Sequence, residues 1–152
     1  MKLSEHITYR EATESYTAKR MNIKNMPTED QMWNMIKLAG AIFEPLREWV
    51  GGPIKINSFF RSEELNKAIG GSSKSQHCSG CAIDIDDVYG YKTNKEMFEY
   101  IKDNLDFDQL IWEFGNSTNP DWVHVSYVSG TENRKRCLKA ERVNGKTVYS
   151  TI

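Results

Sequence analysis

The sequence has no long apolar run, no excess of one charge, and few cysteines or histidines. No stretch approaches the roughly 20 apolar residues of a membrane-spanning helix, so we expect no membrane partner. The chain has 20 lysine and arginine residues and 21 aspartate and glutamate residues. The resulting formal net charge of -1 predicts no nucleic-acid partner. Three cysteines, Cys78, Cys81 and Cys137, are too few for a disulfide framework.

Local signals predict an α+β fold. Three capping boxes, in which a threonine is followed three residues later by glutamate or glutamine, begin helices at Thr8, Thr28 and Thr93. The residues after Thr28 keep their apolar side chains at helical spacing, which predicts one buried face. Strands are expected over residues 54–60, 81–85, 109–114 and 122–127, and Asn144-Gly145 predicts the turn of a hairpin. We therefore expect N-terminal helices packed on a small, mainly antiparallel sheet.

The chain has three histidines, and two of them accompany carboxylates. His77 and Asp84 are seven residues apart in a glycine-punctuated segment, which lets a turn followed by a strand aim both side chains at one point. His124 can supply a third ligand from a neighbouring strand. A set of two histidines and one carboxylate leaves the fourth tetrahedral position open, as in a catalytic rather than a structural zinc site.

A zinc hydrolase also needs a general base, and two carboxylates are candidates. Asp121 comes three residues before His124, so in a regular strand it points to the opposite face, and a bend after Pro120 is needed to bring it to the metal. Glu113 is the alternative. It stands between two aromatic residues, where loss of water raises the pKa of a carboxylate.

These residues belong to a longer pattern. The order S-x-H-x-x-G-x-A-x-D, followed by D/E-x-x-H, resembles the zinc D-alanyl-D-alanine carboxypeptidases and L-alanyl-D-glutamate endopeptidases that cleave bacterial peptidoglycan, in particular their compact phage-type members. The resemblance covers roughly residues 30 to 130 and includes the strand end that carries Arg61. The matched positions are Ser75, His77, Gly80, Ala82, Asp84, Asp121 and His124.

The resemblance implies a role for each matched polar residue. His77, Asp84 and His124 are then the zinc ligands, and Asp121 is the base that activates water and protonates the leaving amine. Arg61 holds a substrate carboxylate or polarises the scissile carbonyl, which suits its fork of donors. Ser75 is expected to hydrogen-bond to the substrate near the metal.

Cys78 and Cys81 form a C-x-x-C pair that permits another interpretation, a thiol redox protein. A redox dithiol usually begins a helix, whereas a strand-like run follows Cys81 here, and no second pair exists for a zinc knuckle. The pair falls on variable positions of the peptidase pattern. A non-catalytic, zinc-containing module that binds the cell wall is the other alternative.

We therefore expect a single metallopeptidase domain over residues 1–152, with a helical part (1–50), a catalytic core (53–130) and a C-terminal hairpin (131–152). Its substrate is expected to be a peptidoglycan stem peptide, its cofactor Zn²⁺ and its oligomeric state monomeric. The first residues are not followed by an apolar segment, which predicts no secretory signal. We thus expect synthesis in the cytoplasm and action at the cell wall after release by another route.

Overall fold

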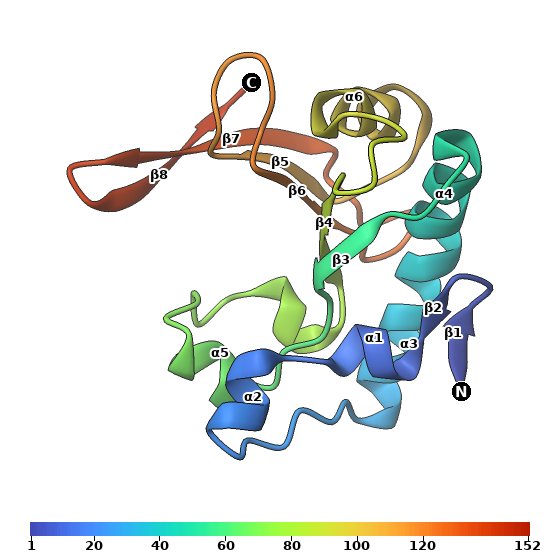
Figure 1. Cartoon of the computed structure of the whole chain (residues 1–152), viewed down its shortest axis with the longest axis vertical. Coiled ribbons are helices and arrows are strands. Elements are labelled where there is room, and N and C mark those ends of the chain that lie inside the picture. The colour runs from blue at the N-terminus through green and yellow to red at the C-terminus, as the bar shows by residue number, and fades with distance from the viewer.

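The computed structural model describes residues 1–152 and confirms the expected α+β fold. A six-stranded sheet in the order β3-β4-β6-β5-β7-β8 forms its centre (Figure 1). The strands of this sheet are β3 (Lys55–Ser58), β4 (Ala82–Asp86), β5 (Gln109–Glu113), β6 (Trp122–Ser126), β7 (Arg136–Val143) and β8 (Lys146–Thr151). A two-stranded sheet of β1 (Lys2–Ser4) and β2 (Ile7–Thr8), which the sequence did not predict, precedes them.

Three of the helices begin where the sequence places their capping boxes. The helices are α1 (Tyr9–Thr13), α2 (Tyr16–Arg20), α3 (Glu29–Leu38), η1 (Ala39–Phe43, a π-helix), α4 (Glu44–Val50), α5 (Glu63–Ala68), η2 (Gln76–Ser79, a 3₁₀-helix) and α6 (Asn94–Asn104). Both halves of the capping box are formed at Thr8, Thr28 and Thr93, which directly precede α1, α3 and α6. No helix combines the length and the apolar composition that crossing a membrane requires.

Every neighbouring pair in the large sheet is antiparallel except β5 and β7, which run parallel. This confirms a mainly antiparallel sheet. Asn144 and Gly145 both have positive φ and connect β7 to β8, as expected for an Asn-Gly hairpin turn. The hairpin extends away from the helices in Figure 1.

The two faces of the sheet differ. One face carries Ile83, Ile85, Val123 and Val125, which belong to a core of 23 buried residues shared with α3, η1, α4 and α6. The side chains of Asp84 and His124 alternate with these and therefore lie on the other face. Figure 1 shows α6 on the core side of the sheet, and α5 with η2 on the other side. A polar cleft can thus form on the second face without disturbing the core.

Candidate metal centre

Three elements bring the predicted ligands together. Asp84 of β4 and His124 of β6 are direct cross-strand partners, so their side chains leave the sheet side by side. His77 comes from η2, a 3₁₀-helix that precedes β4. Their nearest ligand atoms all lie within 4.8 Å of one another. The residues that the sequence proposed as zinc ligands therefore converge on one point.

The carboxylate of Asp84 lies between the two imidazoles. Its Oδ2 atom is 3.2 Å from Nε2 of His77, and its Oδ1 atom is 2.9 Å from Nδ1 of His124. Burial raises the pKa of Asp84, but the two histidines outweigh it and hold the pKa well below its usual range. Ligand atoms about 2.1 Å from a tetrahedral zinc are ~3.4 Å apart, which is close to these spacings.

The two ring nitrogens of His77 have different surroundings. Nδ1 lies 2.8 Å from the carbonyl oxygen of Phe59, which can only accept, so Nδ1 carries the proton. Nε2 is then unprotonated and has a free lone pair. It is buried, has no hydrogen-bond partner and faces the carboxylate of Asp84. Burial also lowers the pKa of His77, which disfavours a second proton. An unpaired nitrogen that faces a carboxylate fits a bound cation.

Local sequence explains the position of His77. The hydroxyl of Ser75 caps η2 by accepting from the His77 backbone N–H at 3.3 Å. Gly80 ends η2 with φ of 78°. A Cβ atom there would lie 2.5 Å from the carbonyl oxygen of Gln31 and 2.8 Å from Cγ of Met35. Only glycine combines this conformation with so close an approach of α3, which accounts for the glycine of the motif.

Arg61 lies directly beside the candidate ligands. Its backbone N–H donates to the carbonyl of His77 at 3.2 Å, and its Nη2 is 3.4 Å from the hydroxyl of Ser75. Burial lowers the pKa of its guanidinium, and the negative charge of Asp84 opposes that effect. Its Nε atom is buried without a partner. The structure therefore brings Arg61 and Ser75, the predicted substrate-binding residues, to the candidate metal centre. The Nε–H of Arg61 is left without an acceptor in the protein.

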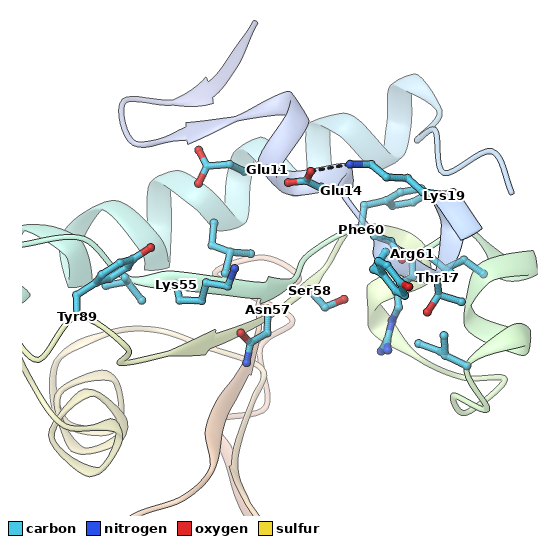
Figure 2. A pocket seen from close by; sticks show the side chains of 16 residues that line it. Glu11, Glu14, Thr17, Lys19, Lys55, Asn57, Ser58, Phe60, Arg61 and Tyr89 are labelled. Atoms are coloured by element: carbon cyan, nitrogen blue, oxygen red, sulfur yellow. Dashed lines mark hydrogen bonds and ion pairs between the residues drawn. The ribbon is translucent and has the colours of Figure 1, made fainter. Parts of the chain in front are cut away.

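A cavity of about 620 Å³ surrounds the three candidate ligands and includes Arg61 and Ser75. Arg61 also lines a second cavity of about 540 Å³ between α1, α2 and β3. Figure 2 shows this second cavity, with Lys55, Asn57 and Ser58 of β3 on one side and the Glu14–Lys19 ion pair on another. Arg61 thus separates two polar hollows, of which only the first contains the candidate ligands.

The two candidate bases occupy different places. Glu113 of β5 lines the cavity of the ligands, next to His124 and Asp84. Asp121 is exposed and lines another hollow, together with Lys139 and Glu141. Asp121 lies at a bend directly before β6, where its backbone N–H donates to the carbonyl of Glu113 at 2.9 Å. Of the two carboxylates, only Glu113 is among the residues that line the cavity of the candidate ligands.

The environment of Glu113 suits proton transfer. The residue is only 7% exposed, and burial raises its pKa to about 7, with His124 lowering it and Asp84 raising it. A carboxylate with a pKa near neutrality can both take and return a proton at physiological pH. The flanking aromatics that suggested this differ in their roles, because Trp112 packs on Phe98 in the core and Phe114 lines the cavity.

The cysteine pair has no comparable geometry. Cys78 and Cys81 are free thiols, and burial raises the pKa of each. A thiol with a raised pKa is a poor nucleophile and a poor metal ligand at neutral pH. Neither cysteine joins the cluster of His77, Asp84 and His124. The thiol redox interpretation therefore gains no support from these surroundings.

Sequence reasoning missed a carboxylate that supports the centre. Asp108 is 1% exposed and accepts from Nε and Nη2 of Arg134, from the Arg134 backbone N–H and from Nε2 of Gln76. Gln76 directly precedes His77, so this network connects η2 to the start of β5. No spacing rule relates residues 76, 108 and 134, and only the three-dimensional arrangement reveals the network.

Comparison with known protein families gives a match over most of the chain. A family model described as Peptidase M15 matches residues 5–126. The matched segment contains the candidate ligands, Arg61, Ser75 and both candidate bases, and it ends before β7 and β8. No curated protein matches the chain.

Proposed function

Because the chain belongs to the peptidase M15 family of metallopeptidases, we propose that it hydrolyses a peptide bond in the stem peptide of bacterial peptidoglycan. The observation that carries this proposal is the convergence of His77, Asp84 and His124 in one cavity. Both bonds suggested by the resemblance remain candidates, D-Ala-D-Ala at the carboxyl end of the stem and L-Ala-D-Glu within it. Such a substrate places the action at the cell wall.

His77, Asp84 and His124 would hold the metal, which we propose to be zinc. Two imidazoles and one carboxylate are the donors that zinc takes in catalytic sites. When bound, zinc acts as a Lewis acid on a peptide carbonyl and makes a water molecule more acidic. The carbonyl of Phe59 contributes by fixing the tautomer of His77, so that Nε2 is free to bind.

We propose Glu113 as the general base in place of Asp121. Its carboxylate faces the same cavity as the ligands, and its raised pKa lets it accept a proton from the attacking water and return it to the leaving amine. Asp121 lines a neighbouring hollow, which shares Phe114 and Trp122 with the cavity of the ligands.

Arg61 and Ser75 are proposed to bind the substrate. The guanidinium of Arg61 can donate to a substrate carboxylate or to the oxygen that gains charge during attack on the carbonyl. The Ser75 hydroxyl already accepts from the His77 backbone and lies next to Arg61, so its own proton remains available for a substrate oxygen.

The test is hydrolysis of purified peptidoglycan and of defined stem peptides by the zinc-loaded protein, with the products identified by mass spectrometry. We expect wild type to cleave one bond. Glu113→Gln should keep its zinc and lose about 10²- to 10⁴-fold in rate, whereas Asp121→Asn should stay close to wild type.

Two outcomes would count against the proposal. A zinc-loaded wild type that binds peptidoglycan but cleaves nothing would instead support the non-catalytic cell-wall-binding module. Loss of hydrolysis in Asp121→Asn with full activity in Glu113→Gln would return the role of base to Asp121.

A further inference from the structure

Part of the candidate active-site cleft comes from a segment outside the family match. Leu138 of β7 and Thr147 and Tyr149 of β8 line the same cavity as the candidate metal ligands. The match to the peptidase family ends at residue 126, and these three residues lie in the C-terminal hairpin that follows. The hairpin therefore adds a wall to the cleft that family membership does not account for.

Sheet register sets Tyr149 across from the candidate base. The strands β6, β5, β7 and β8 are neighbours in this order (Figure 1). One row of direct cross-strand partners on them consists of Trp122, Glu113, Ala140 and Tyr149. Direct partners share a face, so all four side chains leave the sheet on the cleft side. Two strand spacings separate Glu113 from Tyr149, about 10 Å between backbones. The residue between them is an alanine, which leaves the space above it open.

The floor between these two residues is apolar. Ile111, Leu138 and Ala140 are buried on the cleft side of the sheet, form a cluster separate from the main core, and contact Phe114. This floor suits a small apolar side chain of a bound peptide. Tyr149 stands at the outer edge of this floor, on the edge strand β8, and 55% of its surface is exposed.

The surroundings of Tyr149 favour the protonated hydroxyl, which can donate a hydrogen bond. Burial of the ring, together with the negative charges of Glu113 and Asp84, raises the pKa of Tyr149. The phenol hydroxyl of Tyr149 can both donate and accept a hydrogen bond. Because its pKa is raised, it is protonated at neutral pH and can donate to an acceptor in the cleft.

We infer that Tyr149 contacts the substrate: its hydroxyl donates a hydrogen bond to a carbonyl or carboxylate oxygen of the peptide bound over the apolar floor, on the side of Glu113 opposite Trp122. The C-terminal hairpin thereby forms a substrate-binding wall of the cleft. This inference rests on the proposed peptidase function, since it names a further contact in the same site.

The first test is the variant Tyr149→Phe, which removes only the hydroxyl. We expect kcat/KM for a defined stem peptide to fall about three- to tenfold, the effect of one lost hydrogen bond to substrate. Zinc content and melting temperature should not change, because the ring is kept and Tyr149 belongs neither to the candidate ligands nor to the core cluster.

Two matched controls should behave as wild type. Val148→Ala alters the residue of β8 that directly precedes Tyr149, and its side chain points to the opposite face. Tyr100→Phe makes the same chemical change on α6, where the ring stacks on Trp49 on the core side of the sheet. Equal loss in Tyr149→Phe and in these controls would point to a general disturbance and overturn the inference.

A binding measurement separates this inference from the proposed function. The stem peptide can be titrated into the zinc-loaded Glu113→Gln variant, which should cleave it too slowly to disturb the measurement. The same titration is then made with the double variant that also carries Tyr149→Phe. We expect the Tyr149→Phe substitution to raise Kd about three- to tenfold. If wild type cleaves the peptide and Tyr149→Phe has wild-type kcat/KM and Kd, Tyr149 has no such role and the proposed function stands. If wild type cleaves nothing, the proposed function fails, and Kd alone decides whether Tyr149 binds the peptide.

Discussion

Nε2 of His77 and Oδ2 of Asp84 lie 3.2 Å apart in the cleft. The proton of His77 is on Nδ1, where the carbonyl of Phe59 accepts it. Two lone pairs that face each other in a buried place repel unless a cation or a proton joins them. This relationship predicts that the pair is completed by metal.

The first prediction concerns metal content. His77→Ala and Asp84→Ala should lose the single zinc that wild type retains after dialysis, because each removes one of three ligands. Cys78→Ser and Cys81→Ser should retain it. Metal analysis of the purified variants, together with their circular dichroism spectra, gives the answer. Zinc that is lost only when the cysteines are replaced would contradict the assignment and revive the thiol interpretation.

The second prediction is the pH dependence of hydrolysis. Glu113 accepts a proton only when ionised, so kcat/KM should fall as pH drops below the pKa of Glu113. That pKa is about 7 in the metal-free protein, and the positive charge of bound metal should move it lower. The acidic limb of the wild-type profile should therefore lie below pH 7. The residual activity of Glu113→Gln should not show this limb, and an identical limb in that variant would assign it to another group.

The third prediction concerns the cost of burying Glu113. Its pKa is raised from 4.5 to about 7 on folding, so the folded metal-free protein binds this proton more tightly than the unfolded chain. The stability that comes from the neutral acid is complete below pH 4.5 and is lost as pH rises through 7. Glu113→Gln should hence stabilise the metal-free protein by about 3 kcal/mol at pH 8 and by less than about 1 kcal/mol near pH 5.

Urea unfolding of the metal-free protein at the two pH values measures this difference. Glu99→Gln, at an exposed position on α6, is the matched control and should change stability little at either pH. A gain for Glu113→Gln that is equal at pH 5 and pH 8 would mean that ionisation is not its cause.

These results show which parts of the molecule the sequence determines locally. Helix starts at Thr8, Thr28 and Thr93 were predictable because a capping box is complete within four residues. The Asn144-Gly145 turn was predictable for the same reason. The parallel pairing of β5 with β7 was not, because the connection between β6 and β7 carries no signal for the edge of the sheet to which the chain returns.

Some residues of the candidate site could likewise be predicted from the sequence, and others could not. The spacing of His77 and Asp84, with His124 from a later strand, indicated ligands that the structure then brings together. The choice between Glu113 and Asp121 depended on which of the two carboxylates lines the cavity of the ligands, which is a property of the folded sheet. Tyr149 could not be found from sequence, because its position depends on the register of three strand pairs.

The fourth prediction concerns Asp108. The Arg134 guanidinium, with help from Gln76 and against the effect of burial, lowers the pKa of Asp108 to about 2. A lowered pKa gives stability that is present above the ordinary value of 3.8 and is lost as pH falls toward 2. Asp108→Asn should therefore destabilise the protein by about 2 kcal/mol at pH 7, and the difference from wild type should shrink below pH 3.8. Denaturant unfolding at several pH values checks this, with Asp103→Asn, at an exposed position on α6, as the control.

The fifth prediction concerns the glycine that ends η2. Gly80 has φ of 78° and lies against the Gln31 backbone, so alanine there is both strained and too close to α3. Gly80→Ala should cost about 1–3 kcal/mol of stability and weaken zinc binding, because His77 shares the same short helix. Gly90→Ala, also at positive φ but with open space around it, is the matched control: it should show the backbone cost alone and bind zinc as wild type does. If Gly80→Ala and Gly90→Ala lose equal stability and both keep full zinc affinity, contact with α3 does not position His77.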